Sequence, residues 1–369
     1  VFLLSACVQD ASAPAPGANG STGTATLYHN GIVLTMAGEE PNIAEALVEE
    51  DGRILFVGKL SEARERSGHQ AIDLGGATLM PGLIEPHLHP SLAAVMLQNE
   101  ISAPFDWKLP SGVKKGVSGE GNYRERIAES IKQNASPGEM YFIWGYHQLW
   151  HGSLSRNLLN QIAGDQPVGI FHRSFHEIYL NDAAIALLGI RQEDFAANPQ
   201  VDWAKGHFYE GGWLALAPAM EAVLLEPEKY RKGLATMTAI LRRNGITTIA
   251  EPGFPSSDFD AELSLLKSEM ASNPPYDVYL VPSGTQLYAM KGGNEEAMAF
   301  IETLATSKDN TNNIRFLPKQ VKLFADGAIY SQLMQMKDGY TDGHEGEWMT
   351  PLDLFQEQVE LYWRNGYKI

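Results

Sequence analysis

The chain has 369 residues, of which 44% are hydrophobic and 20% charged, so it can bury a large core and its length favours two domains over one. Its net charge of −17, from 28 Lys and Arg against 45 Asp and Glu, argues against binding to a nucleic-acid backbone. Because Cys7 is the only cysteine, a disulfide framework and a cysteine-based zinc cluster are excluded, and any metal must be held by His, carboxylate or a modified lysine.

Residues 1–23 predict the remnant of a lipoprotein signal followed by a flexible linker. Residues 4–7, Leu-Ser-Ala-Cys, resemble the bacterial lipobox, where a signal peptide is cleaved before a cysteine that then receives lipid. The Ala, Pro, Gly and Ser that follow are typical of a tether, and a frayed terminus with a chance cysteine is the alternative. We expect an exported protein with a lipid anchor at Cys7 that faces the periplasm. Val8 favours the outer membrane, by analogy with bacterial lipoproteins.

Residues 24–80 predict a small β domain. Short β-rich runs occur at 27–29, 32–34, 46–48 and 54–57. Asp51 and Gly52 separate the last two runs, and this pair favours a hairpin because both central residues of a type I′ turn need a positive φ.

From residue 81 to 369, strands alternate with helices, which is typical of parallel βα units. Strands are predicted at 83–89, 245–251, 276–281 and 320–325, and residues 367–369 look like the start of a fifth. Helices are predicted at 227–244, with Gly245 as the C-cap, at about 295–306, and from Pro351 to Gly366 with Thr350 as the N-cap. The predicted fold class is α/β: a (β/α)8 TIM-type barrel, incomplete in this chain, after a small β-sandwich-like domain.

Residues 90–235 form a long insertion after the first barrel strand, with extra strands at 141–146 and 168–171. Insertions at the C-terminal ends of barrel strands commonly build active-site walls.

The strongest chemical signal lies at residues 79–90, L-M-P-G-L-I-E-P-H-L-H-P. Side chains alternate along a strand, so His87 and His89 should project to one side, where two imidazoles can share a metal ion. Leu83, Ile84 and Leu88 are expected to supply buried walls. An H-x-H pair often arises by chance, but its place behind Pro-Gly at the exit of a β domain makes it more specific.

This segment resembles the P-G-hydrophobic-hydrophobic-D-x-H-x-H signature of the amidohydrolase superfamily, with Glu85 in place of the aspartate. Residues 321–327, V-K-L-F-A-D-G, are similar to an element of the type 3, or YtcJ-like, branch. The resemblance extends over residues 27–369. It includes four further segments: the lead-in at 73–82, His176 with Asn181, residues 187–190 and residues 245–247.

The resemblance implies one or two divalent metal ions, with Zn²⁺ the first choice, bound by His87, His89 and Lys322. Lys322 lies between apolar residues of a predicted strand, so it should face the barrel interior. In many relatives this lysine is carboxylated and bridges two metals; the alternative is an ion pair with Asp326 or with a substrate carboxylate. Relatives also supply two histidines and a catalytic aspartate from later strands, which we expect beyond residue 369, so no catalytic residue is assigned within this chain.

The remaining candidates depend on context. The strand-like run at 168–171 and the even spacing of His172 and His176 place both on one face of a strand. His176 is predicted to contact a small-molecule substrate, whereas His172 is predicted to be structural. His147 and His151, near Trp150, are expected to pack within a loop. Glu251 ends the second barrel strand and can either reach the site or serve in pairing or capping.

The predicted function is hydrolysis of a C–N bond, in a non-peptide amide or cyclic amide, by a metal-activated water. One alternative is a deaminase of the same superfamily. Lys322 does not favour it, because such enzymes usually keep one metal and lack a bridging lysine. Another is a lipid-anchored binding protein that has lost catalysis. The sequence leaves the substrate open and is compatible with a homo-oligomer.

Overall fold

The structure is a computed structural model that describes residues 25–40 and 42–369, so Cys7 and the predicted leader and linker lie outside the described residues. The chain divides into two compact units, with the boundary between Pro81 and Gly82. In the described part of the chain, no helix has the length and apolar character needed to cross a membrane.

The first unit contains two small sheets and one helix. Its elements are β1 (Thr26–His29), β2 (Ile32–Leu34), β3 (Ile43–Ala44), β4 (Ala46–Glu50), β5 (Arg53–Gly58), α1 (Leu60–Arg66), β6 (Gln70–Asp73) and β7 (Thr78–Leu79). The sheets have the orders β5-β4-β1-β6 and β3-β2-β7. Asp51 and Gly52 have φ values of 51° and 77°, which confirms the predicted hairpin between β4 and β5.

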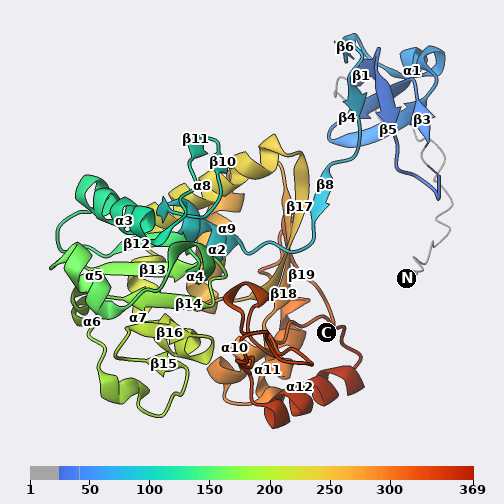
Figure 1. Cartoon of the computed structure of the whole chain (residues 1–369). Helices are drawn as coiled ribbons and strands as arrows, with labels where there is room; N and C mark the ends of the chain where they lie inside the picture. The colour runs from blue at the N-terminus through green and yellow to red at the C-terminus, as the bar shows by residue number, and fades with distance from the viewer. Residues whose placement is uncertain (1–24, 41) are drawn as a thin grey trace. The chain divides into compact units, whose positions relative to one another are not determined.

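A parallel sheet forms the centre of the second unit (Figure 1). Its strands are β8 (Leu83–Glu85), β17 (Ile246–Phe254), β18 (Asp277–Pro282) and β19 (Ile314–Phe316), in the order β19-β18-β17-β8. Beyond β19, Lys322 forms a parallel bridge with Ser283, and Gln320 forms another with Lys368. Residues 320–322 therefore continue the fourth strand position and residues 367–369 lie in the fifth, as the sequence analysis predicted.

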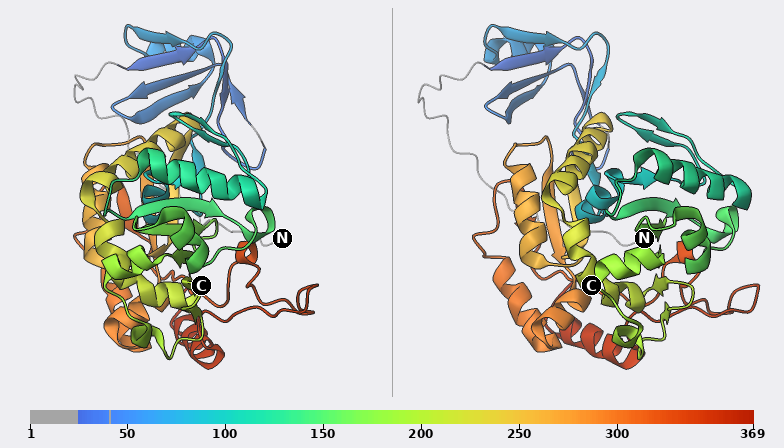
Figure 2. Two further views of the ribbon diagram at one scale, coloured as in Figure 1. Left: turned by 60° about the vertical axis from the view of Figure 1, so that its left-hand side comes forward. Right: turned by 90° about the vertical axis from the view of Figure 1, so that its left-hand side faces the viewer.

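Helices cover this sheet, as βα alternation requires. They are α2 (Pro90–Leu97), α8 (Pro227–Arg243), α9 (Phe259–Met270), α10 (Gly284–Lys291), α11 (Asn294–Leu304) and α12 (Leu352–Arg364). Helices α2, α8 and α9 share one hydrophobic core with β17, β18 and β19, and α8 and α9 can be followed along these strands in Figure 2. Helices α10, α11 and α12 pack in a second core against Val321 and Leu323.

The insertion between α2 and α8 folds around a six-stranded sheet in the order β15-β16-β14-β13-β12-β9. Its elements are β9 (Glu100–Ile101), β10 (Trp107–Leu109), β11 (Gly112–Lys114), α3 (Glu120–Asn134), β12 (Tyr141–Tyr146), α4 (Gln148–His151), α5 (Arg156–Ala163), β13 (Val168–His172), β14 (Glu177–Leu180), α6 (Asp182–Leu188), a 3-10 helix η1 (Gln192–Phe195), β15 (Val201–Asp202), β16 (His207–Tyr209) and α7 (Gly211–Leu224). A short 3-10 helix, η2 (Ile329–Ser331), follows later in the chain.

The structure corrects several sequence expectations. Strand β8 ends at Glu85 rather than His89, and His89 is the residue that precedes α2. Leu83 and Ile84 are 50% and 69% exposed in this chain rather than buried. The chain also contains β19, which the sequence analysis missed. Pro351, not Thr350, stands at the N-cap of α12.

Candidate functional site

His87 and His89 meet just after β8. Their Nε2 atoms lie 3.2 Å apart and their rings are nearly perpendicular, at 85°. Although the strand has ended, the Leu88 amide still donates to the Ala250 carbonyl at 2.9 Å. The backbone therefore continues to follow β17, which preserves the strand-like alternation that turns both histidines to one side.

Glu251, on β17, joins this pair. Its Oε1 atom lies 2.6 Å from His89 Nδ1, and the residue is only 2% exposed. Burial raises the pKa of Glu251, and the contact with His89 opposes that rise. With His89 Nδ1 directed at the carboxylate, Nε2 is left to face His87. Histidines that bind metals commonly donate their other ring N–H to a carboxylate in this way.

Lys322 stands at the fourth strand position, close enough to His87 for its charge to add to the effect of burial, which lowers the pKa of that histidine. Val321 and Leu323 are 3% and 9% exposed and pack against helices, so Lys322 lies on the other face, as predicted from alternation. Burial lowers the pKa of Lys322. The pKa of His87 is lowered too, mainly by burial and then by the charges of His89 and Lys322. Both shifts make the charged form of each group less stable than it is in water.

The structure gives Lys322 no ion pair with Asp326. No carboxylate of the described residues lies within 4.0 Å of its Nζ atom, which sits 5.0 Å from the centroid of the Phe324 ring. Asp326 instead accepts a hydrogen bond from the Gln335 amide at 2.8 Å.

The histidine pair passes a geometric test for a metal site. Two nitrogens bound to one tetrahedral ion at 2.0–2.1 Å lie roughly 3.3 Å apart, close to the observed 3.2 Å. Among the residues that the structure describes, no three His, Cys, Asp or Glu side chains converge on one point. A third protein ligand from this part of the chain would therefore have to be of another type, and Lys322 is the residue that the sequence analysis named.

A second His–Glu pair lies in the insertion. His176 Nδ1 is 2.6 Å from Oε2 of Glu210, which is fully buried between β16 and α7. The other oxygen, Oε1, accepts a hydrogen bond from the Ala328 amide at 3.3 Å. Glu210 has a φ of 44°, a strained conformation for a non-glycine residue that is often found at functional sites.

Gly327 allows this close approach. A Cβ atom on Gly327 would lie 2.7 Å from Glu210 Oε1 and 2.5 Å from Leu333 Cβ. The glycine that ends the 321–327 motif is therefore needed for packing against the buried carboxylate.

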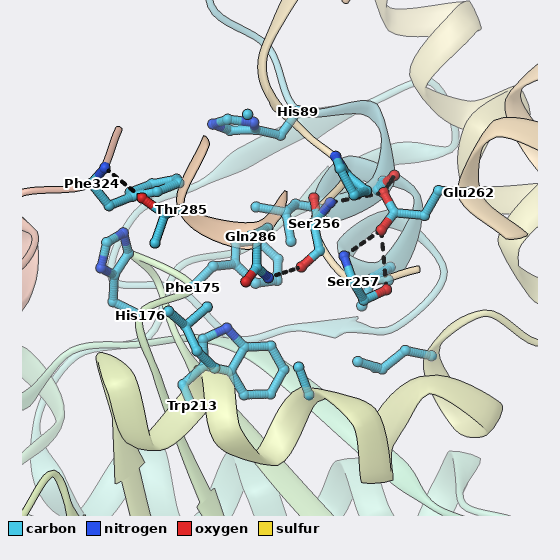
Figure 3. A pocket seen from close by; sticks show the side chains of 18 of the residues that line it. His89, Phe175, His176, Trp213, Ser256, Ser257, Glu262, Thr285, Gln286 and Phe324 are labelled. Carbon is cyan, nitrogen blue, oxygen red and sulfur yellow. Dashed lines mark hydrogen bonds between the residues drawn. The ribbon is translucent and has the colours of Figure 1, made fainter. Parts of the chain in front are cut away.

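A cavity of about 160 Å³ lies beside both pairs. His89 and His176 line it together with apolar side chains of α2, α7 and neighbouring loops, among them Leu92, Val95, Phe175, Trp213, Leu214 and Phe324. In Figure 3, His89, Phe324 and His176 lie towards one end of the cavity and Glu262 towards the other.

Comparison with known proteins identifies the family to which this chain belongs. Residues 70–364 match the sequence profile of the amidohydrolase family, which is most of the chain. The chain belongs to the amidohydrolase family, in its type 3 branch.

Two relatives and one solved structure illustrate the similarity. The putative amidohydrolase YtcJ of Bacillus subtilis is 30% identical over 169 residues, which cover 44% of this chain and 30% of that protein. The N-substituted formamide deformylase of Arthrobacter pascens is 28% identical over 154 residues, which cover 40% of this chain and 26% of the enzyme. The matched regions thus span less than a third of either relative.

An uncharacterized metal-dependent hydrolase from Pyrococcus horikoshii OT3 superposes with a TM-score of 0.64 at 18% identity, over 94% of this chain and 64% of that one. This likeness, together with the mixed helices and strands, shows the α/β TIM-type fold of the amidohydrolases.

Other histidines of this amidohydrolase lie away from the cavity. His172 is fully buried and bonded to Ser174 and Gln148, and burial lowers its pKa to about 2. His151 is buried against the Val117 carbonyl, and burial lowers its pKa to about 4. His147 is buried as the N-cap of α4. All three are buried, as expected, but His147 and His151 lie at the two ends of α4 rather than in a loop.

The relation between His172 and His176 differs from the expectation. Their even spacing predicted one face of a strand, but β13 ends at His172 and β14 begins at Glu177. The chain turns between them, with Phe175 at a φ of 61°, so the even spacing does not apply. The structure brings His87, His89, Glu251 and Lys322 into one region and adds Glu210, which no sequence pattern indicated.

Proposed function

We propose that this amidohydrolase is a metal-dependent hydrolase of C–N bonds in non-peptide amides or cyclic amides. The observation that carries the proposal is the 3.2 Å separation of the His87 and His89 Nε2 atoms, with His89 held by the buried Glu251. The similarity to an enzyme named for removing the formyl group from N-substituted formamides supports an amide as the scissile group.

In this proposal, His87, His89 and Lys322 would hold one or two divalent ions, with zinc as the first choice, and Lys322 would do so as its carboxylated form. A bound ion would lower the pKa of a water molecule and polarise the scissile carbonyl. Glu251 holds the His89 ring so that Nε2 stays directed at His87. His176, held through Nδ1 by Glu210, presents Nε2 for a hydrogen bond to the substrate amide. The apolar cavity wall keeps bulk water away from the bound amide.

Metal content tests this proposal. The full-length protein, supplied with zinc and bicarbonate and purified without chelator, is measured by mass spectrometry beside the variants His87→Ala, His89→Ala and Lys322→Ala. Close to two equivalents of zinc, lost in part or whole in each variant, supports a binuclear hydrolase. One equivalent that survives Lys322→Ala favours the mononuclear deaminase alternative, and protein that binds no metal refutes both.

His207→Ala is the matched control, because this histidine also contacts a buried carboxylate but does not line the cavity. His207 Nε2 lies 2.7 Å from Glu177 Oε2. This variant should keep the zinc content of the unmodified protein.

We further propose export and lipid anchoring through Cys7, to the outer membrane facing the periplasm. The lipobox-like residues 4–7 and the linker composition that follows support this assignment. In the native host, Cys7→Ser should move the protein from the membrane fraction to the soluble periplasmic fraction and remove the lipid mass from the mature N-terminus. A membrane-bound Cys7→Ser protein would contradict the anchor.

A further inference from the structure

The cavity beside His89 has the size of one aromatic ring. Its volume of about 160 Å³ is close to that of an engineered apolar cavity of about 150 Å³ that binds benzene. Two aromatic side chains of the lining, Phe175 and Trp213, are held by the same buried residue. Phe171 is 1% exposed and packs edge-on against Trp213 at 5.4 Å and at a tilt against Phe175 at 5.5 Å. The aromatic wall is therefore preformed.

The lining is unsuited to an anion. Among the residues that the structure describes, the lining contains two carboxylates, Glu221 and Glu262, but neither a lysine nor an arginine, and Lys322 is not part of it. Glu262 is 1% exposed and its oxygens already accept hydrogen bonds from Ser91, Ser256 and Ser257, so it does not need a ligand. A carboxylate placed in this cavity would lose its hydration without gaining a cationic partner.

The two histidines of the lining lie towards one end of the cavity. His89 and His176 both line it, and His176 Nδ1 is occupied by Glu210, which leaves Nε2 for a ligand. A hydrogen bond between His176 and the amide nitrogen of a substrate would direct the substituent on that nitrogen into the apolar part, towards Trp213.

We propose that the substrate is an uncharged amide whose nitrogen carries one apolar group about the size of a benzene ring, with that group bound in the cavity beside Trp213. This substrate class rests on the proposed hydrolysis of C–N bonds and defines the specificity of the same site.

Three matched compounds test the proposal with the zinc-loaded, full-length protein. N-(2-phenylethyl)formamide carries the ring, N-ethylformamide lacks it, and N-formylphenylalanine adds a carboxylate beside the ring. We expect kcat/KM for the phenylethyl compound to exceed that for the ethyl compound by about 10- to 100-fold, from burial of the ring. The carboxylate should lower kcat/KM by about 10-fold or more. Equal values for the ring-bearing and ringless compounds, or a preference for the anion, would overturn the proposal.

A filling variant separates binding in the cavity from loss of folding. Leu214→Trp places a large side chain in the cavity, so it should reduce kcat/KM for the phenylethyl compound by about 10-fold and that for N-ethylformamide by much less, which lowers the preference for the ring. Leu352→Trp, at an exposed leucine of α12, is the matched control and should change neither value. A Leu214→Trp protein that keeps the full preference for the ring would place the ring elsewhere.

Binding distinguishes failure of this inference from failure of the proposed function. The affinities of the same three compounds are measured by calorimetry on the His87→Ala variant, where no hydrolysis is expected. If the unmodified protein hydrolyses none of the compounds but the variant binds the phenylethyl compound at least 10-fold more tightly than the ethyl compound, the cavity assignment holds and the reaction assignment fails. Equal affinities refute the cavity assignment whatever the reaction.

Discussion

Replacing Glu251 by glutamine should weaken metal binding without removing it. The glutamine oxygen can still accept a hydrogen bond from His89 Nδ1, now 2.6 Å from Glu251 Oε1, but the negative charge is lost. A hydrogen bond to a charged group contributes about 1.5–3 kcal/mol and a neutral one about 0.5–1.5 kcal/mol. Because Glu251 is 2% exposed, solvent screens this difference little. A loss of about 1.4 kcal/mol corresponds to about a tenfold weaker affinity.

The assay is a zinc titration of the full-length protein against a competing chelator, with thermal denaturation of each variant in parallel. Glu177→Gln is the matched control, since Glu177 is 6% exposed and lies 2.7 Å from His207, outside the cavity lining. We expect Glu251→Gln to lower zinc affinity about tenfold and Glu177→Gln to leave it unchanged. Unchanged affinity in Glu251→Gln, or an equal loss in both variants, would refute the assigned role of Glu251.

Three further predictions concern the neighbouring carboxylates and Gly327. Glu210→Gln should lower kcat/KM for any turned-over amide by about 10- to 100-fold with little change in Tm, because the charge that orients His176 is lost; a matching loss of Tm would indicate a structural role only. Gly327→Ala should destabilise the protein by about 1–3 kcal/mol in urea unfolding, because its Cβ would lie 2.7 Å from Glu210 Oε1, whereas Gly121→Ala in open space on α3 should not destabilise it. Burial raises the pKa of Glu262, so the folded state binds its proton more tightly and the free energy of unfolding should fall as pH rises above about 4.3. Glu262→Gln should reduce that slope, and an unchanged slope would assign it to other groups.

The sequence predicted those parts of the site that depend on local alternation. His87 and His89 are two residues apart, and the spacing turned both to one side even though β8 ends at Glu85, because Leu88 still bonds to β17. Lys322 follows the same rule, since its neighbours pack on the helices. The parallel direction of the strands was predicted from the alternation of strands and helices.

The partners of these residues could not be predicted, because they come from distant segments. Glu251 is 162 residues from His89, and only the pairing of β8 with β17 brings them together. Glu210 lies at a junction between β16 and α7 in a conformation that its sequence does not signal. The turn between His172 and His176 was missed because a left-handed Phe175, rather than a glycine, makes it.

The pairs His89–Glu251 and His176–Glu210 share an arrangement that a structural His–Glu pair lacks. Glu251 and Glu210 are 2% and 0% exposed, and each lies 2.6 Å from the Nδ1 atom of a histidine that lines the cavity. In both pairs the carboxylate fixes the ring and leaves Nε2 as the outward group.

His207 shows what a structural pair looks like in the same fold. It contacts Glu177 through Nε2 rather than Nδ1, and its ring stacks on Tyr179 at 4.2 Å. The His207 ring is therefore held by Glu177 through Nε2 and by stacking on Tyr179. His207 does not line the cavity. A buried carboxylate beside a histidine is therefore no evidence of a site by itself. In the two functional pairs the carboxylate contacts Nδ1 instead, so that Nε2 of His89 faces His87 as a candidate metal ligand and Nε2 of His176 is available as a candidate substrate contact.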